Sequence, residues 1–126
     1  MAENYQFWTV GAGWTTHDMF ETFTSQGYWE LNYTGRDKNL YVRRVNQMRP
    51  DDRIAIKALS GPGSARMRVR AIGIITSVDT EHMRVTVNWL KTDLDREVPL
   101  NGCMKAVDGP FTLTNKEPWL GKVFRI

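Results

Sequence analysis

Three stretches in the middle of the chain alternate between apolar and polar residues, and this alternation restricts the possible folds more than any other feature. They are "DRIAIKAL" (52–59), "RMRVRAIGII" (66–75) and "MRVTVNW" (83–89). A period of two is that of β-strands with one face buried and the other in water. The first strand is therefore expected to bury Ile54, Ile56 and Ala58 and to turn Arg53 and Lys57 to the opposite side.

A further strand and a helix are expected before these stretches. The run "NYQFWTVGA" (4–12) predicts a buried first strand. The run "TTHDMFETFTSQG" (15–27) predicts a helix, with Thr15 or Thr16 as its N-cap and Gly27 just after its last turn.

A second helix is expected within residues 37–48. Tyr41, Val45 and Met48 fall on one face at helical spacing, and Pro50 follows the expected end. Beyond the alternating stretches the sequence is irregular, apart from "GKVFRI", which is interpreted as a closing strand. The 126 residues suit one domain, and the order of elements predicts an α+β fold with a small curled β-barrel flanked by helices.

Positive charge is concentrated in the middle third of the chain. Residues 36–70 contain ten Lys and Arg against three Asp and Glu, whereas residues 1–35 contain four acids and no Lys or Arg. Such an excess is the expected electrostatic footprint of a protein that binds a polyanion. The alternative is a solvated cationic face that has no partner.

The composition also predicts a cytoplasmic protein. Cys103 is the single cysteine, which excludes an internal disulfide and suits a reducing compartment. The N-terminus has no basic segment followed by an apolar one, and no apolar run is long enough to span a membrane.

No set of residues predicts catalysis, a metal site or a cofactor. His17 and His82 are far apart in sequence, and neither is near a second histidine or a cysteine. "GAG" (11–13) lacks the third glycine of a dinucleotide-binding fingerprint. The acidic run "TDLDRE" (92–97) is interpreted as a solvated turn. A binding domain is therefore favoured over an enzyme.

Several motifs, taken in order, resemble a known family. They are "FWTVGAGW", "GYW", "MRPDDRIAIK", "RVRAIGIIT" and "VTVNW", spread over roughly residues 5–90. The sequence is similar here to the EVE-type domain of the PUA superfamily, and more closely to the N-terminal specificity domains of McrB-like, modification-dependent restriction systems.

This resemblance implies a PUA-like, EVE/YTH-related barrel without catalytic activity of its own. It implies a pocket for a modified base flipped out of double-stranded DNA, most favourably 5-methylcytosine, with modified adenine as the alternative. A separate GTPase motor and nuclease would lie on another part of the chain or on a partner. Residues 1–126 would then form one such domain at the N-terminus of a longer chain.

The related YTH domains hold a methylated base in an aromatic cage, and "GYW" falls at the corresponding place. Trp29 is the first candidate for a cage wall, followed by Tyr33 and Trp14. The alternative is that these rings only fill the core. Asp18, Asn32 or backbone groups of "GAG" and "ALSG" are candidates for hydrogen bonds to the edge of the base.

A second group of residues is expected to contact the DNA backbone or groove. Its members come from the basic middle segment and the "SGPGSAR" loop: Arg43, Arg44, Lys57, Ser60, Ser64, Arg66, Arg68 and Arg70. Arg66, Arg68 and Arg70 share one face of their strand and are the leading candidates for phosphate contacts.

Three other functions stay open at this point. PUA and YTH relatives also bind RNA, so an RNA reader is one alternative. An aromatic cage can also hold methyl-lysine through cation–π contacts, although the basic middle segment would repel a basic peptide. A small hydrolase, as in ASCH-type relatives, would need a strongly shifted lysine or acid within a pocket.

Overall fold

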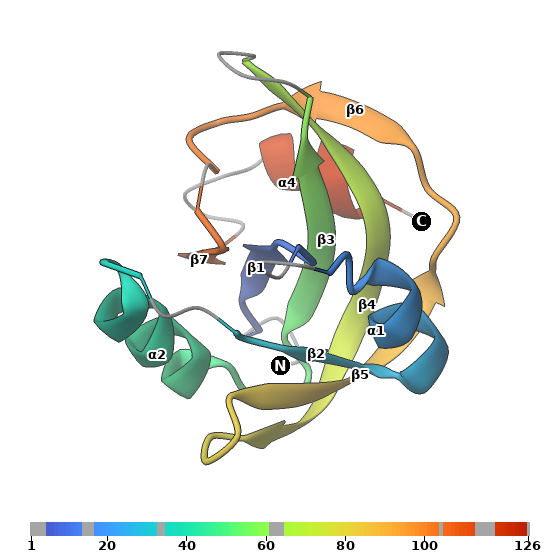
Figure 1. The fold of residues 1–126 in the computed structure, drawn as a ribbon. Coiled ribbons are helices and arrows are strands. Elements are labelled where there is room, and N and C mark those ends of the chain that lie inside the picture. Colours follow the sequence, from blue (N-terminus) through green and yellow to red (C-terminus); the bar gives the residue numbers. More distant parts are fainter. Residues whose placement is uncertain are drawn as a thin grey trace.

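The computed structural model describes residues 5–13, 17–32, 35–60, 65–103, 105–112 and 118–125. Within them the chain forms a mixed α+β fold, in which a curled seven-stranded sheet makes a half-barrel and three short helices pack around it (Figure 1). This agrees with the predicted small curled barrel flanked by helices. In the part of the chain that the structure describes, no helix is both long and apolar enough to cross a membrane.

The strands follow an order that differs from their order in the chain. They are β1 (Phe7–Val10), β2 (Tyr28–Glu30), β3 (Arg53–Leu59), β4 (Arg66–Asp79), β5 (Arg84–Lys91), β6 (Arg96–Pro99) and β7 (Val107–Phe111). Their order in the sheet is β2-β5-β4-β3-β1-β7, and β6 pairs with β4. β1 and β3 are parallel, and the other pairs are antiparallel.

The long strand β4 is the spine of the half-barrel. One edge pairs with β3, and the other pairs first with β6 and then with β5. Register shifts at Ile72/Gly73 and Ile75/Ser77 mark bulges, which bend a strand and increase its twist. Gly73 permits the close crossing of β5, because a Cβ there would lie 2.6 Å from Cγ1 of Val87.

The predicted helices are present, but the first is shorter than predicted. α1 (Phe20–Gln26) begins well after Thr15 and Thr16, which lie outside the described residues. The carboxylate of Asp18 accepts a hydrogen bond from the Phe20 amide at 3.0 Å and so satisfies an amide at the start of the helix. Gly27 ends it in the left-handed conformation, as predicted (φ 78°).

The second helix agrees closely with its prediction. α2 (Lys38–Gln47) buries Tyr41 and Val45, and Met48 is buried just beyond its end. These side chains pack on the concave side of the sheet, in a core that also contains Trp8, Phe23 and Trp29.

The prediction for the last third was wrong. That segment contains β6, β7 and a third helix, α4 (Trp119–Phe124), where a closing strand was expected. The apolar positions Trp119, Leu120 and Val123 are all buried. Their spacing of three and four residues is that of a helix face, whereas a strand would alternate.

The sheet is covered on both sides near β3, and this corrects a second prediction. Ile54 and Ile56 belong to the concave core, whereas Ala55 belongs to a second core formed with α4. Four consecutive residues of β3 are therefore buried, and the fourth is Lys57. The two-sided cover explains why Lys57 does not face solvent as the alternation predicted.

Candidate functional site

One cavity of about 390 Å³ lies where the ends of β1, β2 and β3 meet the segment that enters β7. Its lining combines small, apolar and charged residues from six stretches of the chain: Gly11, Ala12, Gly13, Asp18, Trp29, Glu30, Leu31, Asn32, Ile56, Lys57, Ala58, Leu59, Arg70, Lys105 and Ala106. The sequence placed Trp29, Asp18 and Asn32 in a base pocket, and all three line this cavity.

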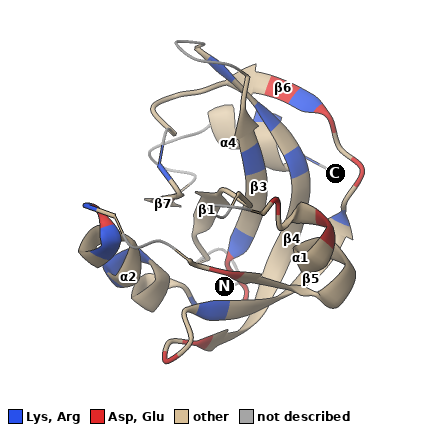
Figure 2. Cartoon of the chain, in the orientation of Figure 1, with Lys and Arg blue, Asp and Glu red and all other residues tan. Residues whose placement is uncertain are grey.

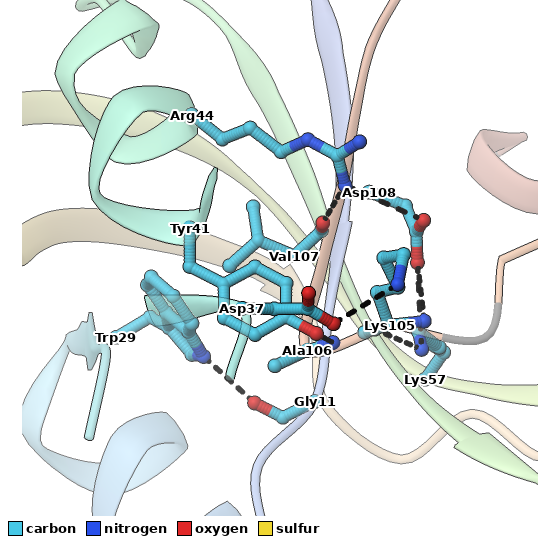
Figure 3. Close-up of polar contacts among 10 residues, drawn as sticks. All are labelled: Gly11, Trp29, Asp37, Tyr41, Arg44, Lys57, Lys105, Ala106, Val107 and Asp108. Carbon is cyan, nitrogen blue, oxygen red and sulfur yellow. Dashed lines mark hydrogen bonds and ion pairs between the residues drawn. The ribbon is translucent and has the colours of Figure 1, made fainter. Parts of the chain in front are cut away.

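Trp29 both lines the cavity and belongs to the concave core. Its side chain is only 1% exposed, and its indole N–H donates a hydrogen bond to the Gly11 carbonyl at 2.8 Å (Figure 3). It lies in the middle of β2, opposite Val85 of β5. The ring is therefore a fixed part of the cavity floor.

Trp14 and Tyr33, the other predicted cage rings, lie outside the described residues. The residues that directly precede them, Gly13 and Asn32, both line the cavity. A Cβ added at Gly13 would have no atom within 4 Å, so this part of the lining faces open space.

Two side chains of opposite charge, Asp18 and Arg70, lie close together at the cavity. Asp18 is exposed, and its second carboxylate oxygen lies 3.8 Å from a guanidinium nitrogen of Arg70. The same guanidinium lies over the ring of Phe20, with 3.9 Å between Cζ and the ring centroid. Arg70 was predicted to contact the DNA backbone, and in the structure it lines the cavity.

Lys57 is buried beside the cavity, with a side chain that is only 5% exposed. Its ammonium group donates a hydrogen bond to the Lys105 carbonyl at 2.6 Å and lies 3.7 Å from the Asp108 carboxylate. Burial lowers the pKa of the Lys57 ammonium, and attraction to Asp108 opposes that shift.

Asp108 joins this lysine to α2. Its carboxylate lies 3.7 Å from Arg44 and accepts a hydrogen bond from the Lys105 amide at 3.0 Å (Figure 3). Burial raises the pKa of the Asp108 carboxyl, and Lys57 is the strongest influence in the opposite direction. Arg44 also donates a hydrogen bond to the Val107 carbonyl, so it is fixed within the fold.

One face of α2 holds the cavity wall at Lys105 and Ala106. Asp37 lies 3.1 Å from the Lys105 ammonium, and the Tyr41 hydroxyl accepts a hydrogen bond from the Ala106 amide at 3.3 Å (Figure 3). With Arg44, these residues have the spacing i, i+4, i+7 that places side chains on one side of a helix. Lys105 and Ala106 were not among the predicted site residues, because they reach the cavity through contacts with α2 that are distant in sequence.

The predicted row of arginines on β4 is present, but acids in and just before β6 face its first two members. Arg66 lies 3.5 Å from Glu97, and Arg68 lies 2.5 Å from Asp95. The hydroxyl of Ser60 donates to Glu97 at 3.3 Å. The acidic run of residues 92–97 therefore supplies partners for this row. Ser64 lies outside the described residues.

Arg43 occupies a different environment from these arginines. It is exposed on α2, and within the described chain no acidic group pairs with it. The residues predicted to contact the DNA backbone therefore differ in environment. Lys57 and Arg44 are held inside the fold, Arg66 and Arg68 face acids, and Arg43 is exposed.

One group of possible metal ligands occurs among the described residues. Atoms of Asp79, Glu81 and His82 lie within 4.8 Å of one another in the exposed turn between β4 and β5. The Asp79 carboxylate already accepts hydrogen bonds from the Glu81 and His82 amides at 3.1 and 3.3 Å and contacts the imidazole at 2.8 Å. These hydrogen bonds explain why the three side chains lie close together, because Asp79 caps the turn that contains Glu81 and His82.

Comparison with known proteins assigns the chain to no family. No protein-family model matches it, and no curated protein sequence matches it. Its function is therefore inferred from the cavity and from the charges around it.

Proposed function

We propose that the chain is a DNA-binding specificity module that accepts a modified base, flipped out of the duplex, in this cavity. The observation that carries the proposal is the convergence of Trp29, Asp18, Asn32 and Arg70 on one cavity from three separate stretches of the chain. Asp18, Asn32 and Arg70 supply groups for hydrogen bonding to a flipped base, and the buried Trp29 ring forms part of the cavity floor.

The size of the cavity and the energies involved are compatible with this role. A volume of about 390 Å³ is within the roughly 300–1,000 Å³ of small-molecule sites. Extrusion of a base costs a few kcal/mol, and stacking on an aromatic side chain returns about 1–3 kcal/mol. Burial of one methyl group adds only about 0.8 kcal/mol, so discrimination requires a close fit around it.

The polar groups complement the edge of a cytosine. Its N4 amino group donates a hydrogen bond, and Asp18 and Asn32 offer acceptor oxygens beside the cavity. Its ring acceptor needs a donor, which Arg70 can supply. These pairings suit cytosine and 5-methylcytosine alike, and adenine has a similar donor and acceptor pattern; the preference for 5-methylcytosine rests on the sequence resemblance.

The wider role rests on the sequence resemblance. As an EVE-type, PUA-like domain, the chain would direct a GTPase motor and a nuclease of a restriction system to modified DNA in the cytoplasm. The half-barrel with flanking helices is compatible with that assignment. The domain itself would bind and would not catalyse.

The charges around the cavity disfavour a methyl-lysine ligand. Lys57, Arg70 and Lys105 outnumber the acids Asp18 and Glu30, and Trp29 is the one aromatic ring among the described lining residues. A cationic ligand would therefore meet repulsion and a single ring in this part of the cavity.

One observation favours a second candidate function, a small hydrolase. The Lys57 amine has a lowered pKa and lies beside the cavity, as such an enzyme would need. Its contacts with the Lys105 carbonyl and Asp108 give it a structural role as well. Mass spectrometry of modified oligonucleotides after incubation separates the two functions, because a binding domain leaves their mass unchanged.

The deciding experiment is a titration at fixed salt with matched plain, 5-methylcytosine and N6-methyladenine duplexes, and with the corresponding RNA. We expect the tightest binding to the 5-methylcytosine duplex. Equal affinities for all three DNA duplexes would refute the proposal, and a preference for RNA would favour the RNA-reader alternative.

Gly13→Ala is the matching test of the cavity. Trp29→Ala is a poor probe, because loss of a buried tryptophan costs about 3–5 kcal/mol of folding free energy. Gly13→Ala adds a methyl group where no atom lies within 4 Å, so it should leave the fold intact and weaken preference for the modified base. Gly121→Ala in α4 meets no atom within 4 Å either and is the control, with no expected change in preference.

A further inference from the structure

We propose that α2 and its flanks, and not the arginine row of β4, bind the phosphate backbone of duplex DNA. The binding surface consists of Arg36, Lys38, Arg43 and Arg49 and is named here the α2 cationic surface. This inference deepens the proposed function and rests on its choice of DNA as the ligand.

The first support is the absence of acidic partners. All four side chains are exposed, and within the described ranges no Asp or Glu forms an ion pair with any of them. Figure 2 shows Lys and Arg on and beside α2. Within residues 36–49 the sequence contains one acid, Asp37. Asp37 is itself engaged by Lys105 at 3.1 Å.

The β4 row has the opposite character. Arg66 faces Glu97 on β6 and Arg68 faces Asp95 just before β6, and in Figure 2 positive and negative bands lie side by side there. A phosphate that approaches this row has to displace a carboxylate or lie beside it. One anion then replaces another at the arginine, whereas at an unpaired cation the phosphate displaces only mobile counterions.

The second support is the position of α2 beside the cavity. Asp37 and Tyr41 hold Lys105 and Ala106, which line the cavity. The β6 edge lies on the other side of the half-barrel in Figure 1. A duplex bound along α2 would therefore lie near the cavity that receives the flipped base.

Charge reversal in matched pairs tests this surface. Lys38→Glu/Arg43→Glu and Arg66→Glu/Arg68→Glu change the net charge equally, and all four positions are exposed. Binding of a plain duplex is measured by fluorescence anisotropy over a salt series. We expect the α2 pair to weaken binding on the order of tenfold and to reduce the salt slope by about two, one for each lost phosphate contact. The β4 pair should have a clearly smaller effect.

A gain of binding gives an independent test. Asp37→Asn removes the acid that engages Lys105, and Asp95→Asn removes the acid that engages Arg68. Both variants change the net charge by the same amount. Asp37→Asn should tighten binding of the plain duplex more than Asp95→Asn does. Equal effects of the two variants would mean that only net charge matters and would overturn the inference.

The outcomes separate this inference from the proposed function. If the wild type binds all DNA duplexes equally but the α2 pair weakens that binding, the α2 cationic surface stands and the base-reading function fails. If the 5-methylcytosine preference is present but the β4 pair has the larger effect, only the inference about α2 is overturned. Binding to anionic lipid vesicles with no binding to the duplex overturns both.

Discussion

Two sets of ion pairs in this protein use the same kinds of side chain in opposite environments. In the buried set, Lys57 and Asp108 have side chains that are 5% and 10% exposed, and Arg44 lies beside them. In the surface set, Arg66 and Glu97 are 49% and 46% exposed. Each set joins a cation of the basic middle segment to an acid of the last third, yet only the first is part of the cavity framework.

The comparison shows that the Lys and Arg residues counted in a sequence are not all available to a ligand, because in the fold some of them are paired with acids. Water and mobile ions screen the surface pairs, so the net contribution of such a pair to folding is small. In the buried set each charge depends on its partner, because an isolated charge in the interior has lost its hydration. The three predictions below test this contrast in order of decreasing effect.

The largest effect is expected for Asp108→Ala. This change leaves the Lys57 ammonium buried without a carboxylate and removes the acceptor of the Lys105 amide. We expect a loss of about 3–5 kcal/mol in the free energy of unfolding, measured by urea denaturation. Glu97→Ala is the control and should cost about 0.2–1 kcal/mol. Similar losses for the two variants would contradict the contrast.

A smaller effect is expected for Lys57→Met. The Asp108 carboxylate then keeps Arg44 and the Lys105 amide as partners, so the destabilisation should be clearly less than that of Asp108→Ala. The methionine also retains most of the apolar contacts of the lysine stem. Denaturation of both variants in the same buffer measures the order. A greater loss for Lys57→Met would show that Arg44 does not support Asp108.

The smallest effect concerns the exposed pair Asp79 and His82. The hydrogen bond to Asp79 raises the pKa of the His82 imidazole, and that to His82 lowers the pKa of the Asp79 carboxyl. A raised histidine pKa stabilises the fold fully below the unfolded value of about 6.5, and this contribution disappears as pH rises through the folded value. In Asp79→Asn the pKa of His82 should fall towards its ordinary value, as measured by NMR titration. An unchanged pKa would mean that the contact does not persist in solution.

The sequence predicted the elements that have a regular apolar pattern. The strands β3, β4 and β5 follow from alternation, and the buried face of α2 follows from helical spacing. The prediction failed at Lys57, because β3 is covered on both sides and alternation no longer separates core from solvent. It failed again at α4, where "GKVFRI" was considered without Trp119 and Leu120, which complete the helical face.

The candidate site was predictable only in part. Trp29, Asp18 and Asn32 were chosen from their places near a turn and a helix, and the fold brings them to one cavity. Lys105 and Ala106 could not be chosen, since their positions depend on contacts with α2 that are 65 or more residues away in sequence. The acidic partners of Arg66 and Arg68 could not be predicted from the sequence either, because the pairing of β6 with β4 joins residues that are distant in the chain.

The place of Trp29 in the sheet has a consequence for how fast the cavity can admit a ligand. β2 has three residues and lies at the edge of the sheet, where β5 is its one partner among the described strands. Short edge segments exchange their amide hydrogens through local openings that leave the rest of the fold intact, whereas a strand paired along both edges exchanges only in larger openings. The cavity floor therefore lies on a strand whose local opening would also break the hydrogen bond from the Trp29 indole to the Gly11 carbonyl. Entry of a bulky ligand by such an opening would cost this contact as well.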